Sequence, residues 1–283
     1  MKELRYAFHV FAPYRAARKA SIFGSARTRE DDPLYHQARD LAAALATRGW
    51  MIVTGAGPGI MTAGIEGAGP DNAFGVSIRL PFEGTVSESL TGDRLINFQY
   101  FFTRKLAFVK ESDAFVLLPG GFGTLDEAFE TLTLVQTGKA QPAPIVLLDV
   151  PGGTYWTGWR DFVVAELLDR GYLSPTDLDL VRITDDVDVA VDECVRFYAN
   201  YHSMRFVGRD LVLRVRHAPD ATALERLNVE FADLLAAGEI TVSGPTPRES
   251  RDADEVHLDR VVLRFDRYHW SRLRRLIDAL NSL

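Results

Sequence analysis

The chain has little cysteine, no long apolar run and no excess of positive charge, and each shortage excludes a class of protein. Its single cysteine among 283 residues, Cys194, excludes an intrachain disulfide and a multi-cysteine metal site. Because Cys194 lies in an apolar helical pattern, we expect a buried small side chain rather than a nucleophile. No apolar run approaches the length that crosses a bilayer, and the N-terminus lacks a signal-peptide pattern. We therefore expect a cytoplasmic protein that does not enter a membrane.

The balance of charge is acidic, with 32 Lys and Arg against 39 Asp and Glu and a net charge of −7. A general nucleic-acid binder would have a basic surface, so we expect no nucleic-acid partner. An anionic small molecule is not excluded, because a local group of donors can override the global field. The hydrophobic share of 47% is typical of a globular protein.

Apolar segments alternate with helical patterns over the first two thirds of the chain. Continuous apolar strands separated by helices predict a Rossmann-like α/β fold, a parallel sheet with helices on both faces. We expect strands at 19–25, 50–54, 74–78, 95–98, 113–118 and 144–149, and helices at 33–49, 60–67, 102–111, 125–138, 156–171 and 186–201. Such a sheet binds its ligands beyond the carboxyl ends of its strands.

The pattern changes near residues 202–209. The remainder reads as strand, helix, strand, strand and helix, which predicts a Rossmann-like domain over 1–204 and a small C-terminal α+β domain over 205–283. The second domain carries no glycine loop. Its arginines fit a solvated helix face or an interface better than a basic patch. These arginines are Arg264, Arg267, Arg272, Arg274 and Arg275. One hypothesis gives this domain a regulatory role, binding an effector or a partner.

The segment PGGFGTLDE, Pro119–Glu127, is the most informative stretch. It joins an apolar strand to a helical pattern, so backbone N–H groups and the helix N-terminus can hold an anion. We expect Glu127 on the first turn of that helix, where it would repel a phosphate at contact distance. The pattern therefore predicts a phosphate near the glycines and Glu127 aimed at a sugar carbon or its attacking water. The expected phosphate contacts are Gly120, Gly121, Gly123 and Thr124.

Two other glycine loops follow strands that should end at the same edge of the sheet. The spacing Gly55-Ala56-Gly57-Pro58-Gly59 does not match the dinucleotide fingerprint, and the strand at 74–78 holds no acidic residue, so NAD is not predicted. In the first loop, the Ser25 hydroxyl and the planar Arg27 guanidinium suit a phosphate. The candidate ligand contacts in these loops are Gly24, Ser25, Arg27, Gly55, Gly57 and Gly59.

A polar pair, Arg104-Lys105, interrupts an aromatic run that begins at Tyr100. Either both side chains extend to the surface, or Arg104 enters the pocket and meets Glu127 and the substrate. The position of the pair leaves these interpretations evenly balanced.

Together these motifs resemble the LOG ("lonely guy") family of phosphoribohydrolases, formerly labelled lysine decarboxylases. The family motif PGGxGTxxE is matched in full from Pro119 to Glu127, and an upstream Arg-Lys pair is matched by Arg104-Lys105. The resemblance spans about residues 20–198. One departure is Ala56, where many relatives have glycine. Nothing marks the pyridoxal-phosphate lysine that a decarboxylase needs.

The resemblance implies hydrolysis of the N-glycosidic bond of a nucleoside 5′-monophosphate, such as a cytokinin riboside 5′-monophosphate or AMP. Glu127 and Arg104 are then the catalytic candidates, and Lys105 joins the phosphate-binding residues. No metal or cofactor is expected, and the family's architecture implies a homodimer or a larger homo-oligomer. A non-catalytic carrier of a nucleotide or of the molybdenum cofactor is the alternative, which does not need the pairing of Arg104 with Glu127. The sequence does not identify the base.

Overall fold

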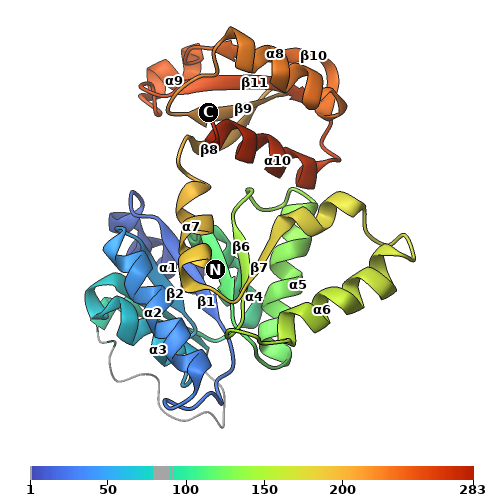
Figure 1. The fold of residues 1–283 in the computed structure, drawn as a ribbon. Coiled ribbons are helices and arrows are strands. Elements are labelled where there is room, and N and C mark those ends of the chain that lie inside the picture. Colours follow the sequence, from blue (N-terminus) through green and yellow to red (C-terminus); the bar gives the residue numbers. More distant parts are fainter. Residues whose placement is uncertain (1, 79–89, 91) are drawn as a thin grey trace. The chain divides into compact units, whose positions relative to one another are not determined.

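The computed structural model describes residues 2–78, 90 and 92–283. The contacts divide the chain into two compact units, coloured along the sequence in Figure 1. The first unit comprises Met1–Leu134, Ala143–Ser174 and Val181–Cys194, and the second comprises Val135–Pro142, Pro175–Leu180 and Val195–Leu283. The domain boundary expected after Met204 falls inside a strand, Tyr201–Val207, and stays a prediction.

The first unit is built on a seven-stranded parallel sheet. Its strands, in spatial order, are β4 (Leu95–Phe98), β3 (Ala73–Ile78), β2 (Met51–Thr54), β1 (Lys19–Phe23), β5 (Ala114–Leu117), β6 (Ile145–Leu148) and β7 (Val181–Thr184). The Rossmann-like fold class predicted from the sequence is confirmed. The six expected strands are present, and β7 is an additional edge strand. It was missed because it is short and only partly buried.

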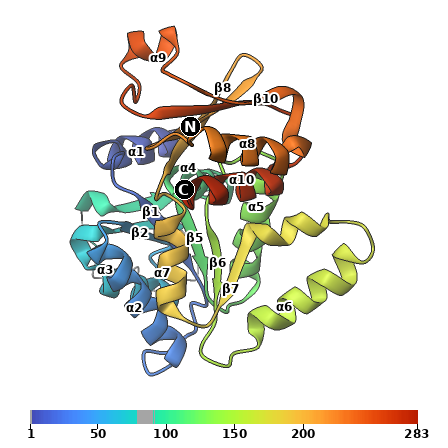
Figure 2. The same ribbon diagram turned by 45° about the horizontal axis from the view of Figure 1, so that its top comes forward.

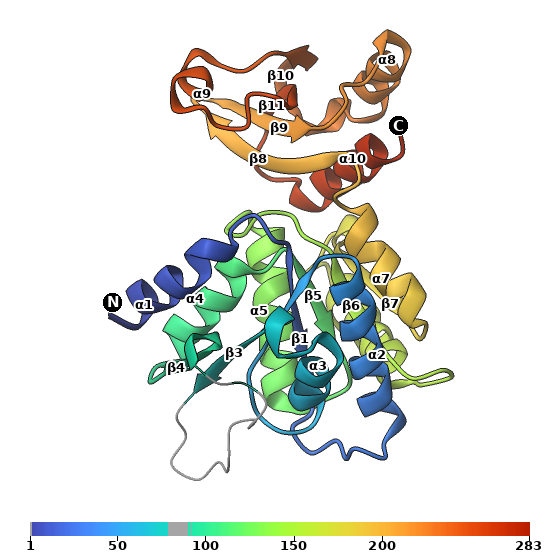
Figure 3. The same cartoon turned by 90° about the vertical axis from the view of Figure 1, so that its left-hand side faces the viewer.

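Helices cover both faces of this sheet, with α2, α3 and α7 on one side and α1, α4 and α5 on the other (Figure 3). The bounds are α1 (Lys2–Phe11), α2 (Pro33–Thr47), α3 (Ile60–Ala68), α4 (Phe101–Glu111), α5 (Phe122–Gln136), α6 (Tyr155–Val163) and α7 (Val187–Arg196). Short 3₁₀ or π turns lie at Ala12–Tyr14, Pro70–Asn72, Gly92–Arg94, Val164–Leu168 and Pro175–Leu180.

Local sequence signals account for where these helices begin. In α2, Pro33 occupies the first helical position, and the side chain of Asp32 accepts a hydrogen bond from the Leu34 N–H at 2.9 Å. The face of α2 toward the sheet is apolar, and Leu41 and Leu45 are fully buried. The expected helix over 33–49 is confirmed.

The strand order places a topological switch point between β1 and β5. From β1 the chain moves outward to β4, then crosses back to the other side of β1 and continues from β5 to β7. After β1 and after β5 the chain therefore continues in opposite directions along the sheet, and such a switch point is where open α/β sheets bind ligands.

The second unit is an antiparallel four-stranded sheet with spatial order β10-β11-β9-β8. Figure 2 shows α8 and α10 on one face, where residues such as Leu213, Phe231 and Leu276 form a core. The bounds are β8 (Tyr201–Val207), β9 (Asp210–Val215), α8 (Ala221–Glu230), β10 (Leu235–Ser243), α9 (Pro247–Asp252), β11 (Asp259–Phe265) and α10 (Trp270–Asn281), with a 3₁₀ turn at Ala232–Leu234. The α+β class is confirmed, although β8 and α9 were not expected.

The five arginines singled out in the second unit each contact another side chain. Arg264 pairs with Asp210 at 2.8 Å, and Arg275 pairs with Asp179 at 2.6 Å. Two further pairs are Arg272–Asp233 and Arg274–Asp278, and the Arg267 guanidinium lies over the Phe206 ring. Arg267 and Arg275 are exposed, whereas Arg274 is buried. The expectation of a solvated face or an interface stays a prediction.

The cysteine and the helices agree with what the composition predicts. Cys194 is a fully buried residue of α7, as expected for a small apolar side chain. Within the described part of the chain, no helix is both long and apolar enough to span a membrane. The cytoplasmic location stays a prediction.

Candidate functional site

Three loops meet at the switch point. The Ser25 N–H, just after β1, donates to the carbonyl of Pro119, just after β5, at 3.3 Å. The Ser25 carbonyl in turn accepts from the N–H of Ile60, the first residue of α3, at 3.1 Å. The structure therefore brings together all three glycine-containing segments found in the sequence.

Glycine is required where these loops touch. A Cβ on Gly24 would lie 2.7 Å from the side chain of Ile60, and one on Gly59 would overlap the Ser25 carbonyl oxygen. A Cβ on Gly120 would overlap the Thr124 hydroxyl. Because real carbon atoms do not approach so closely, larger residues would force the loops apart.

The residues Pro119–Gly123, which we call the glycine turn, lead into α5 earlier than expected. The helix begins at Phe122 rather than near Leu125, so Glu127 lies on its second turn and the prediction of the first turn is wrong. The sequence pattern missed this because Gly123 and the exposed Phe122 interrupt the apolar stripe of the helix. Glu127 still shares a helix face with Gly123 and Thr124, since residues three and four apart are neighbours.

The helix N-terminus itself is open. Gly121, Phe122 and Gly123 are exposed, and Phe122 is 93% accessible. The Gly121 carbonyl accepts from the N–H groups of Thr124 and Leu125, both at 3.1 Å, which starts the helix. Thr124 is buried beneath the turn.

Glu127 is a buried carboxylate, with the residue only 7% exposed. Burial raises the pKa of Glu127 above its ordinary value, and the positive charges of Lys105 and Arg104 act in the opposite direction. The Lys105 Nζ lies 3.7 Å from a Glu127 carboxylate oxygen, an ion-pair distance beyond that of a direct hydrogen bond. Glu127 thus has partial charge compensation, as functional acids often do.

Lys105 lies within a group of acids. Its ammonium is 2.7 Å from Glu130 and 3.0 Å from Asp126, and Glu127 is the third acid. Although burial opposes it, the hydrogen bonds to Glu130 and Asp126 raise the pKa of Lys105, so the side chain carries its charge. Its predicted role as a phosphate contact stays untested, and its observed contacts are all carboxylates.

The Arg104 side chain contacts strand β3 and the loop at Gly55. Its Nε donates to the Val76 carbonyl at 2.8 Å, and its guanidinium lies 5.1 Å from the centre of the Phe108 ring. A Cβ on Gly55 would lie 2.5 Å from an Arg104 guanidinium nitrogen, so this side chain packs against the second glycine loop. The α4 pair therefore divides, with Arg104 at the Gly55 loop and Lys105 at α5.

The other predicted contacts lie in the first two loops. The Ser25 hydroxyl accepts from the Arg27 N–H at 3.0 Å, and the Arg27 residue is exposed. Ala56 adopts a left-handed backbone, with φ of +57°, and its N–H donates to the Thr54 hydroxyl at 3.1 Å. Glycine adopts this left-handed conformation with less strain than alanine does. Gly57 lies over the side chain of Met61.

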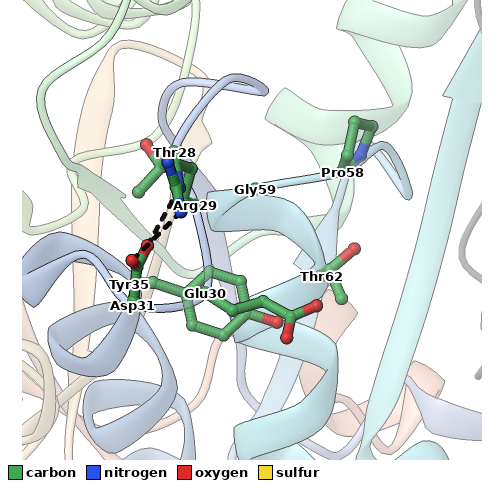
Figure 4. A pocket seen from close by; sticks show the side chains of 8 residues that line it. All are labelled: Thr28, Arg29, Glu30, Asp31, Tyr35, Pro58, Gly59 and Thr62. Atoms are coloured by element: carbon green, nitrogen blue, oxygen red, sulfur yellow. Dashed lines mark hydrogen bonds and ion pairs between the residues drawn. The ribbon is translucent and has the colours of Figure 1, made fainter.

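A cavity of about 460 Å³ lies beside these loops (Figure 4). Its lining residues are Thr28, Arg29, Glu30, Asp31, Tyr35, Pro58, Gly59 and Thr62. Of these, only Gly59 was singled out from the sequence. Arg29 pairs with Asp31, and the buried Tyr35 hydroxyl donates to Glu66 at 2.8 Å. Burial raises the pKa of Tyr35, so its hydroxyl stays protonated. Glu127 and Arg104 are not part of this lining.

Sequence reasoning missed Tyr155 and Asp149. The Tyr155 hydroxyl donates to the Gly120 carbonyl at 2.7 Å, and the buried Asp149 accepts from the Tyr155 N–H at 2.9 Å. The available signal was that Asp149 ends an apolar strand at the same sheet edge. Across the described residues, no group of three or more His, Cys, Asp or Glu side chains is arranged to hold a metal ion.

Comparison with known proteins agrees with the motifs. A family model described as "Possible lysine decarboxylase" matches residues 53–194, half of the chain. A "Cytokinin riboside 5′-monophosphate phosphoribohydrolase" of Mycobacterium tuberculosis is 34% identical over 164 residues, covering 57% of this chain and 85% of the relative. This chain belongs to the LOG family. Another LOG relative, of the same name, from Mycobacterium marinum, is 31% identical over the same shares of both chains.

Among solved structures, the molybdenum cofactor carrier protein of Chlamydomonas reinhardtii aligns with a TM-score of 0.44 and 24% identity. The alignment covers 63% of this LOG chain and 98% of the carrier. At these values the likeness adds nothing to the family assignment.

Proposed function

We propose that this LOG-family chain hydrolyses the N-glycosidic bond of a nucleoside 5′-monophosphate, releasing the free base and ribose 5-phosphate. The observation that carries the proposal is the placement of Glu127. It is a buried, partly compensated carboxylate one turn along α5 from an exposed glycine turn. The names of the LOG relatives support the same reaction class.

In this proposal the 5′-phosphate binds the N–H groups at the start of α5. The helix N-terminus and the glycine turn supply donors and a partial positive charge to an anion. The Ser25 hydroxyl and the Arg27 guanidinium are within the neighbouring loop and complete the set of phosphate ligands. Binding at the phosphate then anchors the nucleotide so that its sugar lies beside Glu127.

Glu127 acts at the sugar. As the C1′–N bond breaks, positive charge develops on the ribose, and a fixed carboxylate stabilises it. Water adds its oxygen to C1′, the bonding electron pair leaves with the base nitrogen, and the proton released by the water ends on that nitrogen. Lys105 and Arg104 keep Glu127 ionised for this role, in keeping with the direction in which both act on its pKa.

The test of this proposal is a panel of nucleoside 5′-monophosphates that includes AMP and an isopentenyl-adenosine monophosphate. We expect free base and ribose 5-phosphate in equal amounts from at least one of them, measured by chromatography. Binding of these nucleotides without release of base would contradict the proposal and support a non-catalytic carrier instead.

We also propose that the protein acts as a homodimer through the aromatic surface of α4 and α5. Phe102 is 70% exposed, and Tyr100, Phe101, Leu106 and Phe129 are also exposed, which is unusual for a monomer. A second copy is the occupant that the family resemblance implies. Light scattering after gel filtration tests this, since Phe102→Glu is expected to convert a dimer of the wild type into a monomer. A wild type that elutes as a monomer would contradict it.

A further inference from the structure

Tyr155 connects two parts of the first unit that are far apart in sequence. Its hydroxyl donates to the Gly120 carbonyl in the glycine turn, 35 residues earlier in the chain. The phenol is held firmly, because Asp149 binds the Tyr155 N–H and the ring packs edge-on against Trp156 with centroids 4.8 Å apart. Trp156 is fully buried, and its indole N–H donates to the Leu148 carbonyl at 3.2 Å.

The first three carbonyl groups of the glycine turn are all occupied by protein donors. Pro119 accepts from the Ser25 N–H, Gly120 accepts from Tyr155, and Gly121 accepts from the first turn of α5. Every peptide bond in the described structure is trans, so each N–H points opposite to the carbonyl of its own peptide group. Fixing these three carbonyls therefore fixes the directions of the N–H groups of Gly120, Gly121 and Phe122.

The peptide between Gly120 and Gly121 is the one most able to turn over. Glycine on both sides leaves little steric barrier to rotation, and Gly121 is exposed, with open space within 4 Å of the position that a Cβ would take. Turned over, this peptide would present its carbonyl oxygen in place of its N–H to an anion. Of the three carbonyls, this one alone accepts from a side chain.

We propose that Tyr155 is a positioning residue of the glycine turn, holding the Gly120–Gly121 peptide with its N–H toward the substrate phosphate. The inference rests on the proposed function for the identity of the substrate. Its consequence is specific to the phosphate, because Tyr155 acts through the glycine turn and not through Glu127. Loss of the hydroxyl should weaken phosphate binding and leave the chemistry at the sugar intact.

Tyr155→Phe tests this, since it removes the hydroxyl and keeps the ring against Trp156. We expect KM for AMP and the inhibition constant of inorganic phosphate both to rise about tenfold, with kcat within about twofold. The affinity for adenosine, which lacks the phosphate, is expected to be unchanged, as is the melting temperature. The matched control is Tyr172→Phe, which removes a hydroxyl from an exposed tyrosine elsewhere in the unit. An unchanged KM and phosphate inhibition, or equal losses with AMP and adenosine, would overturn the proposal.

A binding measurement separates this inference from the proposed function. Calorimetry with AMP and with inorganic phosphate is carried out on Glu127→Gln and on Glu127→Gln combined with Tyr155→Phe. A tenfold weaker affinity in the double variant supports the role of Tyr155 even if the wild type releases no base, and equal affinities refute it. Absence of binding of either ligand to the wild type would refute the inference and the proposed function together.

Discussion

The two units each bury a glutamate on a helix, and the two carboxylates have opposite electrostatic environments. Glu249 of α9 is fully buried and accepts hydrogen bonds from Arg214, at 2.7 Å, and from the Thr246 N–H, at 2.9 Å. The Arg260 guanidinium lies 3.5 Å from the same Glu249 oxygen that the Thr246 N–H binds. Although burial opposes it, these donors lower the pKa of Glu249 to about 2.

Glu127 is also buried, but its ion-pair partner Lys105 lies 3.7 Å away, and the pKa of its carboxyl is raised. By this contrast, we interpret Glu249 as a structural acid and Glu127 as an acid that serves the proposed reaction. Glu249 connects α9 to the sheet of the second unit, and a structural role needs complete pairing. In the proposed function, the Glu127 carboxylate accepts from a ligand at the sheet edge where α/β folds bind ligands.

The largest expected effect concerns turnover. Glu127→Gln removes the charge that stabilises the sugar cation, so we expect kcat to fall by about a thousandfold or more, with the affinity for AMP changed by less than about threefold. Steady-state kinetics and calorimetry measure the two quantities. Asp126→Asn, an exposed neighbour that also contacts Lys105, is the matched control and should retain most activity. Activity of Glu127→Gln within tenfold of the wild type would remove the distinction between the two glutamates.

The next largest effect concerns stability. Glu249→Ala leaves the buried Arg214 and Arg260 without their shared acid, which should lower the free energy of unfolding of the second unit by about 3–5 kcal/mol. Chemical denaturation measures this change. Glu225→Ala, an exposed acid on α8, should change stability by less than about 0.5 kcal/mol. Similar small effects for both variants would show that the Glu249 cluster is not structural.

The same cluster predicts a pH dependence. The folded-state pKa of Glu249 lies below its unfolded value, so its contribution is fully present above the unfolded pKa and is lost as pH falls through about 2. Wild type should therefore lose stability between about pH 4.5 and 2 more steeply than Glu249→Gln. Thermal unfolding followed across this range gives the comparison, and parallel curves would contradict it.

A further contrast concerns how Glu127 is kept ionised. Lys105→Met removes the nearest cation, so the pKa of Glu127 should rise and the acidic limb of the kcat/KM profile should move to higher pH. Lys110→Met is the control, because Lys110 lies on the same helix but pairs with Glu111 instead of Glu127. If KM for AMP rises while the limb stays in place, Lys105 contacts the phosphate as the sequence resemblance implied.

The smallest effect concerns the backbone of the second glycine loop. Ala56→Gly removes the strain of a left-handed alanine, which stabilises the folded state by about 1 kcal/mol. Glycine also gives the unfolded chain more conformational entropy, which lowers the free energy of unfolding by a similar amount. We therefore expect the free energy of unfolding to change by less than about 1 kcal/mol. Gly49→Ala, which introduces a side chain at φ of +80° without a steric clash, should destabilise by about 1 kcal/mol. A large loss in Ala56→Gly would mean that the alanine methyl is needed in the core.

The features predicted correctly from the sequence are those set by local patterns. Apolar runs of four to six residues identified the strands that line both sides of the switch point, and the glycine clusters identified the loops after β1, β2 and β5. Parallel strands end at one edge of a sheet, so these local signals were sufficient to predict that the loops holding Ser25, Gly59 and Pro119 lie together.

The features that were missed depend on contacts between distant segments. No local pattern indicates that Tyr155 reaches Gly120, or that Lys105 meets three acids of α5. The start of α5 was placed late because its first residues are glycines and an exposed phenylalanine, which lack helical periodicity. Edge strand β7 was missed because its side chains are only partly buried.

The most direct measurement of the central claim is a crystal structure of Glu127→Gln with bound AMP. We predict the phosphate on the N–H groups of Gly121, Phe122 and Gly123, and the side-chain amide of residue 127 about 3–4 Å from the ribose ring at C1′. A phosphate bound elsewhere, or a residue 127 side chain directed away from the sugar, would contradict the account.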